Sequence, residues 1–205
     1  MINVLLTLCL ILVICHRLNP LKLKKLFRMK VGLKQCMTNR FSFRGMTSRL
    51  EGEHIIGTKW IFHNKTDGEG NVICNKARLV AQGYSQMEGV DYDETFAPVA
   101  RMASIIIFLA LACQLKFKLY QMDVKTAFLN GLLKEDVYVV QPKRLINPHF
   151  PDHVLYLKKA LYGLKQAPRA WYDRLTQYFV SHGFTKGKAD QTLFIKREDG
   201  ELIVA

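Results

Sequence analysis

The sequence lacks any recognisable pairing pattern among its cysteines. Its 205 residues include five, with no Cys-x-x-Cys pair: Cys9, Cys15, Cys36, Cys74 and Cys113. An odd number without paired spacing argues against the disulfide framework of a small secreted domain and indicates a reducing compartment. The sequence also lacks a glycine-rich phosphate loop and a Gly-x-Ser-x-Gly motif, which argues against P-loop nucleotide binding and serine-hydrolase chemistry.

Acidic residues are missing from the first 50 positions, although this segment contains ten Lys and Arg residues. It therefore supplies +10 of the formal net charge of +13. Residues 51–205 carry twenty basic and seventeen acidic side chains, a net charge of only +3. The basic character thus belongs to the N-terminal quarter and is weak support for nucleic-acid binding by the rest of the chain.

No apolar run is as long as an ordinary membrane span. Residues 2–15, INVLLTLCLILVIC, are apolar apart from Asn3 and Thr7, whereas a transmembrane helix needs about 20 apolar residues. No basic stretch precedes this run and no small-x-small cleavage site follows it, so it does not resemble a complete signal peptide. We expect a cytoplasmic or nuclear protein, with membrane anchoring through residues 2–15 as a minor alternative.

After residue 50 the sequence shows readable secondary-structure patterns. ASIIIFLALACQL at 103–115 is apolar on nearly all sides and predicts a buried helix. KLYQMD at 118–123 predicts a strand buried against that helix. The remaining predicted elements are a long hairpin of 54–65 and 72–83 around the turn TDGEGN, a strand at 137–142 ended by Pro142, a helix at 167–183 ended by Gly183, and a hairpin at 191–205.

Three segments carry a resemblance to a known family. They are KARLVAQGYSQMEGVDYDETFAPVAR at 76–101, YQMDVKTAFLNG at 120–131 and LKKALYGLKQAPRAWYDRL at 157–175. Together they resemble the reverse transcriptase of copia-type retrotransposons, from about Ile55 to Ala205. Three motifs in the right order make coincidence implausible, in contrast to any single short pattern.

The resemblance implies an α+β fold, a partial right-hand polymerase with β-rich fingers and an incomplete palm. We assign this partial domain to residues 51–205. Residues 1–50 do not match the family, and we predict that they are disordered or non-native. Residues 22–39 can be encoded by DNA that reads in a neighbouring frame as IEEAFQDESWVKAMHDE, which resembles the acidic helix preceding the fingers in this family. Residues 1–50 are therefore predicted to be out-of-frame translation or a wrongly assigned exon.

The resemblance identifies Asp123 as a catalytic carboxylate. A polymerase joins a 3′-hydroxyl to an α-phosphate with two divalent metals about 3.5–4 Å apart. Mg²⁺ prefers hard oxygen ligands, so a carboxylate at a rigid strand end suits it. Asp123, with the main-chain carbonyl of Val124, would be such a ligand pair. For an isolated Asp, a turn or helix cap would be the ordinary interpretation.

Four further residues are implied to bind the incoming nucleotide: Lys76, Arg78, Phe128 and Gly163. Lys76 and Arg78 resemble the basic residues that grip the triphosphate, and Arg suits phosphate because its planar fork donates two hydrogen bonds. A solvated strand face is the alternative for Lys76. Phe128 resembles the aromatic residue that packs beneath the sugar and selects deoxynucleotides, with core packing as the alternative. Gly163 would permit close backbone approach.

The segment GLKQAP is implied to lie under the template base. The template or primer contacts expected there are Lys165, Gln166, Pro168 and Arg169, although a solvated helix start is an alternative. The implied partners are an RNA/DNA primer–template, deoxynucleoside triphosphates and other Pol regions, with Mg²⁺ as the metal and no small-molecule cofactor. Trp171 and Tyr172 are expected to be core residues.

The sequence departs from the family after Ala205, where the family continues into a Tyr-x-Asp-Asp hairpin. No Asp-Asp dipeptide occurs in the 205 residues, and thumb and ribonuclease H regions are absent as well. Because one carboxylate cannot offset the repulsion of two Mg²⁺ ions, we expect no polymerase activity. A non-catalytic nucleic-acid-binding remnant is the alternative function.

Overall fold

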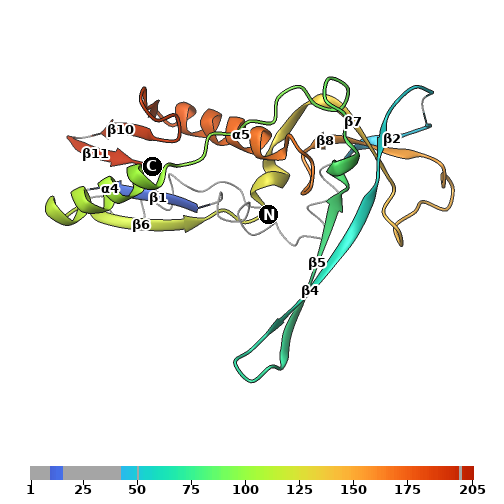
Figure 1. The fold of residues 1–205 in the computed structure, drawn as a ribbon, viewed down its shortest axis with the longest axis horizontal. Helices are drawn as coiled ribbons and strands as arrows, with labels where there is room; N and C mark the ends of the chain where they lie inside the picture. The colour runs from blue at the N-terminus through green and yellow to red at the C-terminus, as the bar shows by residue number, and fades with distance from the viewer. Residues whose placement is uncertain (1–9, 16–42, 50, 199) are drawn as a thin grey trace. The chain divides into compact units, whose positions relative to one another are not determined.

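The computed structural model describes residues 10–15, 43–49, 51–198 and 200–205 (Figure 1). These residues fall into two compact units. Unit 1 comprises the described parts of Met1–Val31, Ala97–Ala127 and Tyr172–Ala205. Unit 2 comprises the described parts of Gly32–Phe96 and Phe128–Trp171.

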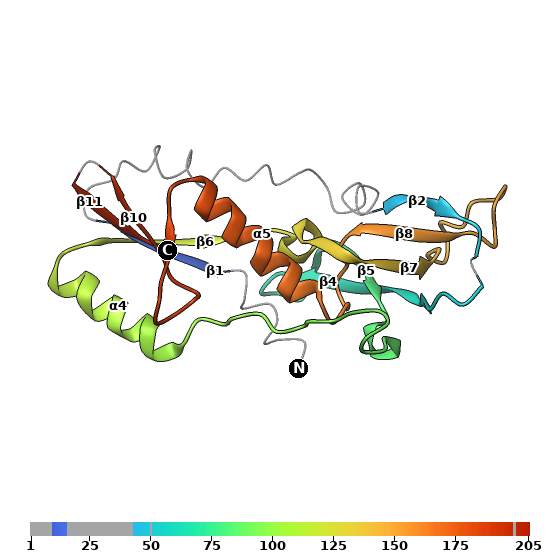
Figure 2. The ribbon, with the colours of Figure 1, turned by 90° about the horizontal axis from the view of Figure 1, so that it is seen from above.

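Unit 1 contains a five-stranded antiparallel sheet in the order β6-β1-β11-β10-β9. The first strand in sequence, β1, lies inside the sheet, between β6 and β11 (Figure 1); Figure 2 shows the same strands from above, where they overlap. Two helices accompany these strands: α4 (Met102–Gln114) and the second part of α5 (Ala167–Ser181). The strands are β1 (Leu10–Cys15), β6 (Lys118–Asp123), β9 (Thr185–Lys186), β10 (Phe194–Glu198) and β11 (Glu201–Val204).

The core of unit 1 is aromatic. Phe179 of α5 stacks on Phe194 of β10 with ring centroids 4.6 Å apart, and contacts Phe184 edge to face. Ile203 of β11 completes this cluster of buried side chains. Burial of such large apolar surfaces is the main favourable contribution to folding.

The prediction that residues 103–115 form a helix is confirmed by α4, but the prediction that it is buried is wrong. Ala112 is its only buried residue, and Ile106 and Ile107 are each 58% exposed. An apolar sequence favours burial of a helix. Burial occurs, however, only where other elements of the structure cover the faces of that helix. The described residues cover only the side of α4 that carries Ser104, Phe108 and Ala112.

Strand β6 likewise forms where predicted but is not buried. Its exposure alternates along the strand, and none of its six residues is fully buried. Tyr120 and Met122 are partly buried against the aromatic core, whereas Gln121 and Asp123 are exposed. One face of β6 therefore packs on the core and the other is open, as expected for a strand with period-two alternation.

Unit 2 contains a four-stranded sheet in the order β2-β8-β7-β3 and a separate two-stranded hairpin of β4 and β5. Only the pairing of β3 with β7 is parallel. Two short 3₁₀ helices, η2 (Gly83–Ser85) and η3 (Ala127–Asn130), connect strands. The strands are β2 (Phe43–Thr47), β3 (Ile55–Ile56), β4 (Thr58–Thr66), β5 (Val72–Ala81), β7 (Leu132–Val140) and β8 (Val154–Lys159).

Most element predictions after residue 50 are confirmed. The predicted hairpin of 54–65 and 72–83 is β4–β5, whose turn is closed by amide N–H groups of Glu69 and Asn71 donating to Asp67 Oδ1. The helix predicted at 167–183 ends at Ser181, before Gly183 at φ +82°. The C-terminal hairpin is β10–β11, with Gly200 at φ +76°. Trp171 and Tyr172 are buried, as expected.

Two segments of residues 1–50 form strands rather than being disordered, while the prediction that residues 1–50 are non-native stays a prediction. Leu10–Cys15 forms the inner strand β1, and Phe43–Thr47 pairs with β8 as β2. Apolar and β-branched residues favour extended structure where neighbouring strands offer pairing partners. Residues 22–39, on which the frame-shift prediction rests, lie outside the described residues. Among the described helices, none is long and apolar enough to cross a membrane.

Candidate functional site

Asp123 is the last residue of β6, in unit 1. Met122 and Val124 on either side of it are partly buried against the aromatic core, while Asp123 is exposed. Because successive side chains of a strand point to opposite faces, its carboxylate lies on the face away from that core. The sheet thus fixes the backbone of Asp123 and leaves its charged group accessible.

The described residues do not make up a magnesium site around Asp123. They contain no group of three or more His, Cys, Asp or Glu side chains that could hold a metal ion. Mg²⁺ needs near-octahedral oxygen coordination, usually with carboxylates. Asp123 and the Val124 carbonyl are two candidate ligands, and two ligands do not suffice to hold a pair of divalent ions.

Lys76 and Arg78 lie on one face of β5, in unit 2, because they are two residues apart. In the β4–β5 ladder Lys76 pairs with His63 and Arg78 with Ile61. Directly paired residues share a face, so Lys59 and Lys65, at alternate positions of β4, belong to the same face. We call the set Lys59, His63, Lys65, Lys76 and Arg78 the basic face. Sequence reasoning did not identify Lys59, His63 and Lys65 of β4 as site residues, although their spacing of two and four residues is that of one strand face.

Phe128 is 6% exposed and lies in η3. Its ring contacts that of Tyr162 edge to face, with centroids 5.7 Å apart. This packing is the alternative that the sequence left open for Phe128, and its predicted place beneath a sugar stays a prediction.

Gly163 lies close to the backbone of β5, and its predicted place in the nucleotide site stays a prediction. It adopts φ +94°, and an added Cβ would lie 2.2 Å from the Ala81 carbonyl oxygen. The Ala81 N–H donates to the Tyr162 carbonyl at 2.8 Å. A Cβ on Gly83 would lie 1.9 Å from the Gly163 oxygen. Glycine is therefore required where the 163–166 turn meets the end of the hairpin.

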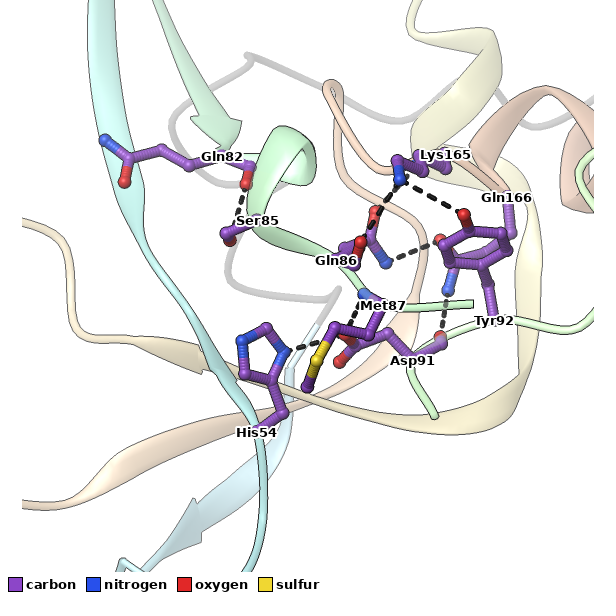
Figure 3. A network of polar contacts seen from close by, with 9 residues as sticks. All are labelled: His54, Gln82, Ser85, Gln86, Met87, Asp91, Tyr92, Lys165 and Gln166. Carbon is purple, nitrogen blue, oxygen red and sulfur yellow. Dashed lines mark hydrogen bonds and ion pairs between the residues drawn. The ribbon is translucent and has the colours of Figure 1, made fainter. Parts of the chain in front are cut away.

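A buried polar network joins this turn to the loop that follows β5 (Figure 3). Gln166 is 2% exposed; its Oε1 accepts from Gln86 Nε2 at 3.0 Å and its Nε2 donates to the Asp91 carbonyl at 2.9 Å. Gln86 Oε1 accepts from the Lys165 amide N–H at 2.8 Å. We call the set His54, Gln86, Asp91, Tyr92, Lys165 and Gln166 the polar network.

Lys165 directs its ammonium group into the polar network (Figure 3). Its Nζ donates to the Gln86 carbonyl and to the Tyr92 hydroxyl, each at 3.1 Å, and lies 4.8 Å from the Tyr92 ring centroid. The donors of Lys165 and the amide of Gln166 are thus engaged within unit 2. Template contacts by these two residues stay a prediction, and such contacts would have to compete with these bonds.

Asp91 is the buried acid of the polar network, 3% exposed. Its Oδ2 accepts from the Met87 N–H at 2.7 Å and lies 2.7 Å from His54 Nδ1. An ionised carboxylate can only accept, so this contact suits the His54 tautomer that carries its proton on Nδ1. Sequence reasoning missed both residues, because nothing in the spacing of His54 and Asp91 indicates that they meet.

The start of α5 carries the last two predicted contacts. Pro168 is the second residue of α5, in the first turn, where proline is tolerated. Arg169 Nη2 lies 3.2 Å from Glu94 Oε2, and its Nη1 donates to the Phe96 carbonyl at 3.2 Å. Of the predicted site residues, Asp123 and Val124 thus lie in unit 1, and the others lie in unit 2.

The described residues form a mixed α+β chain, and comparison with known proteins gives its family. Residues 45–205 match the family described as "Reverse transcriptase (RNA-dependent DNA polymerase)". The chain belongs to the reverse transcriptase family. Its relatives confirm the copia-type resemblance, and the match begins ten residues before Ile55 and includes part of β2.

The similar proteins are Pol polyproteins of transposons. The chain is 45% identical over 149 residues to the Retrovirus-related Pol polyprotein from transposon RE1 of Arabidopsis thaliana, covering 73% of the chain. It is 42% identical over 147 residues to that from transposon TNT 1-94 of Nicotiana tabacum, covering 72%. The Transposon Ty1-H Gag-Pol polyprotein of Saccharomyces cerevisiae is 28% identical over 153 residues, also 72% of the chain.

The chain spans a small part of these relatives: 10% of the RE1 protein, 11% of the TNT 1-94 protein and 8% of the Ty1-H protein. No solved structure matches the chain. The family is therefore shown by sequence, and the right-hand polymerase architecture stays a prediction.

Proposed function

We propose that this chain takes part in RNA-directed DNA synthesis and contributes Asp123 as a catalytic carboxylate. The observation that carries the proposal is the position of Asp123: it closes β6 with an exposed carboxylate, while its neighbours Met122 and Val124 pack on the core. A side chain held by a sheet has the positional precision that catalysis needs. The family match over residues 45–205 supports the same role.

The basic face of β4–β5 is proposed to bind phosphate. Polymerisation transfers a nucleotide whose triphosphate is strongly negative, and cations on a rigid element lower the cost of holding it. Arg78 is the first candidate because its guanidinium can donate two parallel hydrogen bonds to one phosphate. Lys59, Lys65 and Lys76 share its face and would add positive charge around that contact or along a template strand.

Phe128 and Gly163 are proposed to shape the nucleotide site, and Pro168 and Arg169 to border the template. Primer–template, deoxynucleoside triphosphate and other Pol regions are the proposed partners. The Phe128 ring is already held by Tyr162, so it could present a fixed edge against a sugar. A steric edge of this kind discriminates by excluding the 2′-hydroxyl.

A polypeptide of these 205 residues is proposed to be inactive by itself. Asp123 would be its one catalytic carboxylate, and several acidic ligands are needed to hold two divalent ions close together. Primer extension with Mg²⁺ or Mn²⁺ on an RNA template tests this, with Asp123→Asn as the matched control. We expect no incorporation from either protein; incorporation that Asp123→Asn abolishes would overturn the proposed inactivity.

Nucleic-acid binding tests the rest of the proposal. Fluorescence anisotropy with a labelled primer–template should show binding that weakens as salt rises, because neutralised phosphates release counterions. The test should use the full chain and a version lacking residues 1–50, since those residues hold ten basic side chains and no acidic ones. Loss of all binding in the shortened protein at low salt would contradict a phosphate-binding role for the basic face.

A further inference from the structure

We propose that the gap between β6 and β11 in unit 1 is a binding site for one extended apolar strand, and that residues 10–15 of the same chain are its occupant. We call this gap the strand site. It is bounded by the backbone edge of Lys118–Asp123 on one side and by that of Glu201–Val204 on the other. Figure 1 shows β1 lying between these strands.

β1 pairs along its whole length with β6 but only at its last two residues with β11. β1 pairs with β6 over six consecutive residue pairs, from Leu10 opposite Asp123 to Cys15 opposite Lys118. On its other side Ile14 lies opposite Val204, and Cys15 lies opposite Ile203. Among the described strands of this sheet, β6 has no other neighbour. β1 is therefore what joins the strand of Asp123 to the rest of the sheet.

The sequence of β1 suits an inner strand. LILVIC is apolar without interruption, which is typical of a strand with both faces covered, whereas strands with one wet face alternate. On the neighbouring strand, Tyr120 and Met122 pack against the aromatic core. The strand site thus offers two backbone edges and an apolar surface, which together select an extended apolar segment without proline.

The strand site can hold only one strand at a time. The other edge of β11 is already paired with β10, so any second strand that pairs antiparallel with β11 must displace β1. An empty strand site would leave two unpaired edges, which other extended chains can join. Residues 10–15 therefore act as an internal plug that also fixes the backbone position of Asp123.

Disulfide formation tests the occupant and its register. In a protein in which Cys9, Cys36, Cys74 and Cys113 are replaced by Ser, Cys15 remains as the single thiol. Lys118→Cys adds a second thiol directly opposite Cys15. A second in-register pair is Ile14→Cys with Leu119→Cys in the same protein with Cys15→Ser. Adjacent antiparallel pairs alternate between hydrogen-bonded and non-hydrogen-bonded geometry, so the two designs sample both.

The matched control is Gln121→Cys, which keeps Cys15 as its potential partner. Gln121 is also exposed on β6 but lies opposite Leu12, about 10 Å along the strand from the Lys118 position. That separation exceeds the Cα distance of about 4.4–6.8 Å that a disulfide can bridge. Under mild oxidation and peptide mapping we expect an intramolecular disulfide in the in-register pairs and background levels in the control. Equal crosslinking in all three, or crosslinks only between chains, would overturn the proposal.

Peptide exchange tests whether the strand site accepts a strand in trans. The probe is a fluorescent peptide, Lys-Lys-Leu-Ile-Leu-Val-Ile-Ser-Lys-Lys, and its control has Pro in place of the second Leu. We expect the peptide to bind a protein lacking residues 1–15 at least tenfold more tightly than the full chain, and the Pro control to bind neither. Equal binding to both proteins would contradict the plug. If the shortened protein does not fold, the disulfide test on the full chain still decides the occupant.

The strand site borders Asp123, but the experiments on the strand site and on nucleic-acid binding fail separately. The crosslinks report only on unit 1, without nucleic acid or nucleotide. Failure of primer–template binding would leave the strand site intact, and failure of the crosslinks would leave the basic face of unit 2 unaffected.

Discussion

Unit 1 is held together by stacked aromatic rings, whereas the predicted binding residues of unit 2 are held by buried polar side chains. Phe179, Phe184 and Phe194 form a continuous apolar contact. In unit 2, Gln86 and Gln166 exchange hydrogen bonds and Asp91 is buried beside them. Apolar contacts tolerate changes of shape, but a buried polar group must keep its partner. The two units should therefore respond differently to conservative substitutions.

The largest expected loss comes from emptying the core of unit 1. Phe179→Ala should lower the free energy of unfolding by about 3–5 kcal/mol, because it removes a buried ring and leaves a cavity. Its neighbour Val180 is 55% exposed, so Val180→Ala should cost under about 0.5 kcal/mol. Urea unfolding measures both, and hydrogen exchange should locate the Phe179→Ala loss in unit 1. Similar losses for the two variants would contradict the aromatic core.

The next effect tests the contact between the 163–166 turn and β5. Gly163→Ala places a methyl group 2.2 Å from the Ala81 oxygen at positive φ, and should destabilise unit 2 by about 2–4 kcal/mol from crowding and backbone strain together. Gly89→Ala is the matched control: Gly89 also has positive φ, +78°, but no atom lies within 4 Å of its added Cβ. Thermal unfolding should show the smaller loss for Gly89→Ala. Equal losses would mean that the close approach does not matter.

Substitutions that conserve side-chain volume compare how much stability a buried polar group contributes in unit 2 and a buried apolar group in unit 1. Gln166→Met keeps the side-chain size but leaves Gln86 Nε2 and the Asp91 carbonyl without partners, and should cost about 1–3 kcal/mol. Ile203→Leu, in the core of unit 1, should cost less than about 1.5 kcal/mol. Denaturant titration of both proteins measures the difference. A larger loss for Ile203→Leu would reverse the proposed contrast.

Salt dependence separates a positioning role of Lys165 from a phosphate contact. Its ammonium already has the Gln86 carbonyl and the Tyr92 hydroxyl as partners. Lys165→Met should therefore lower stability by about 1 kcal/mol and leave the salt slope of primer–template binding unchanged. Arg78→Met should reduce the slope by about 0.7–0.9, the loss of one phosphate contact. A reduced slope for Lys165→Met would show that it meets template phosphate.

The smallest expected effect is a change with pH in the free energy of unfolding, caused by Asp190 in unit 1. Burial, the largest single influence, raises the pKa of Asp190, but hydrogen bonds from Thr192 and Ser104 together outweigh it and lower the pKa below its usual 3.8. A lowered folded-state pKa contributes stability above the unfolded-state value, and this contribution is lost as pH falls through the folded-state value. Asp190→Asn should thus cost about 1 kcal/mol at pH 7 and progressively less below pH 3.8.

Urea titrations from pH 7 to pH 3 would follow that convergence. Asp152→Asn provides the control, because Asp152 is an exposed loop residue of unit 2. Its unfolding curve should track that of the unchanged protein across the range. A difference between Asp190→Asn and the unchanged protein that persists undiminished at pH 3 would contradict the ionised role of Asp190.

Local pattern predicted the elements, and long-range contacts decided what covers them. The β4–β5 hairpin, helix α5 and the strand ending at Asp123 were readable because periodicity and turn residues act over a few positions. The burial of α4 was not, since it depends on neighbours elsewhere in the chain. Gln86 and Gln166 are 80 residues apart, and no sequence pattern links them. Asp91 and His54 were missed for the same reason.

The inner position of β1 also has a consequence for biosynthesis. Its apolar residues are translated before both of its sheet neighbours, β6 and β11, which follow at long sequence separation. Such high contact order slows folding, because distant segments must meet before the pairing stabilises them. During that interval residues 10–15 expose apolar side chains that are prone to aggregation, and chaperones bind segments of this kind. Yield of native protein should therefore depend on how quickly β6 and β11 become available to pair with β1.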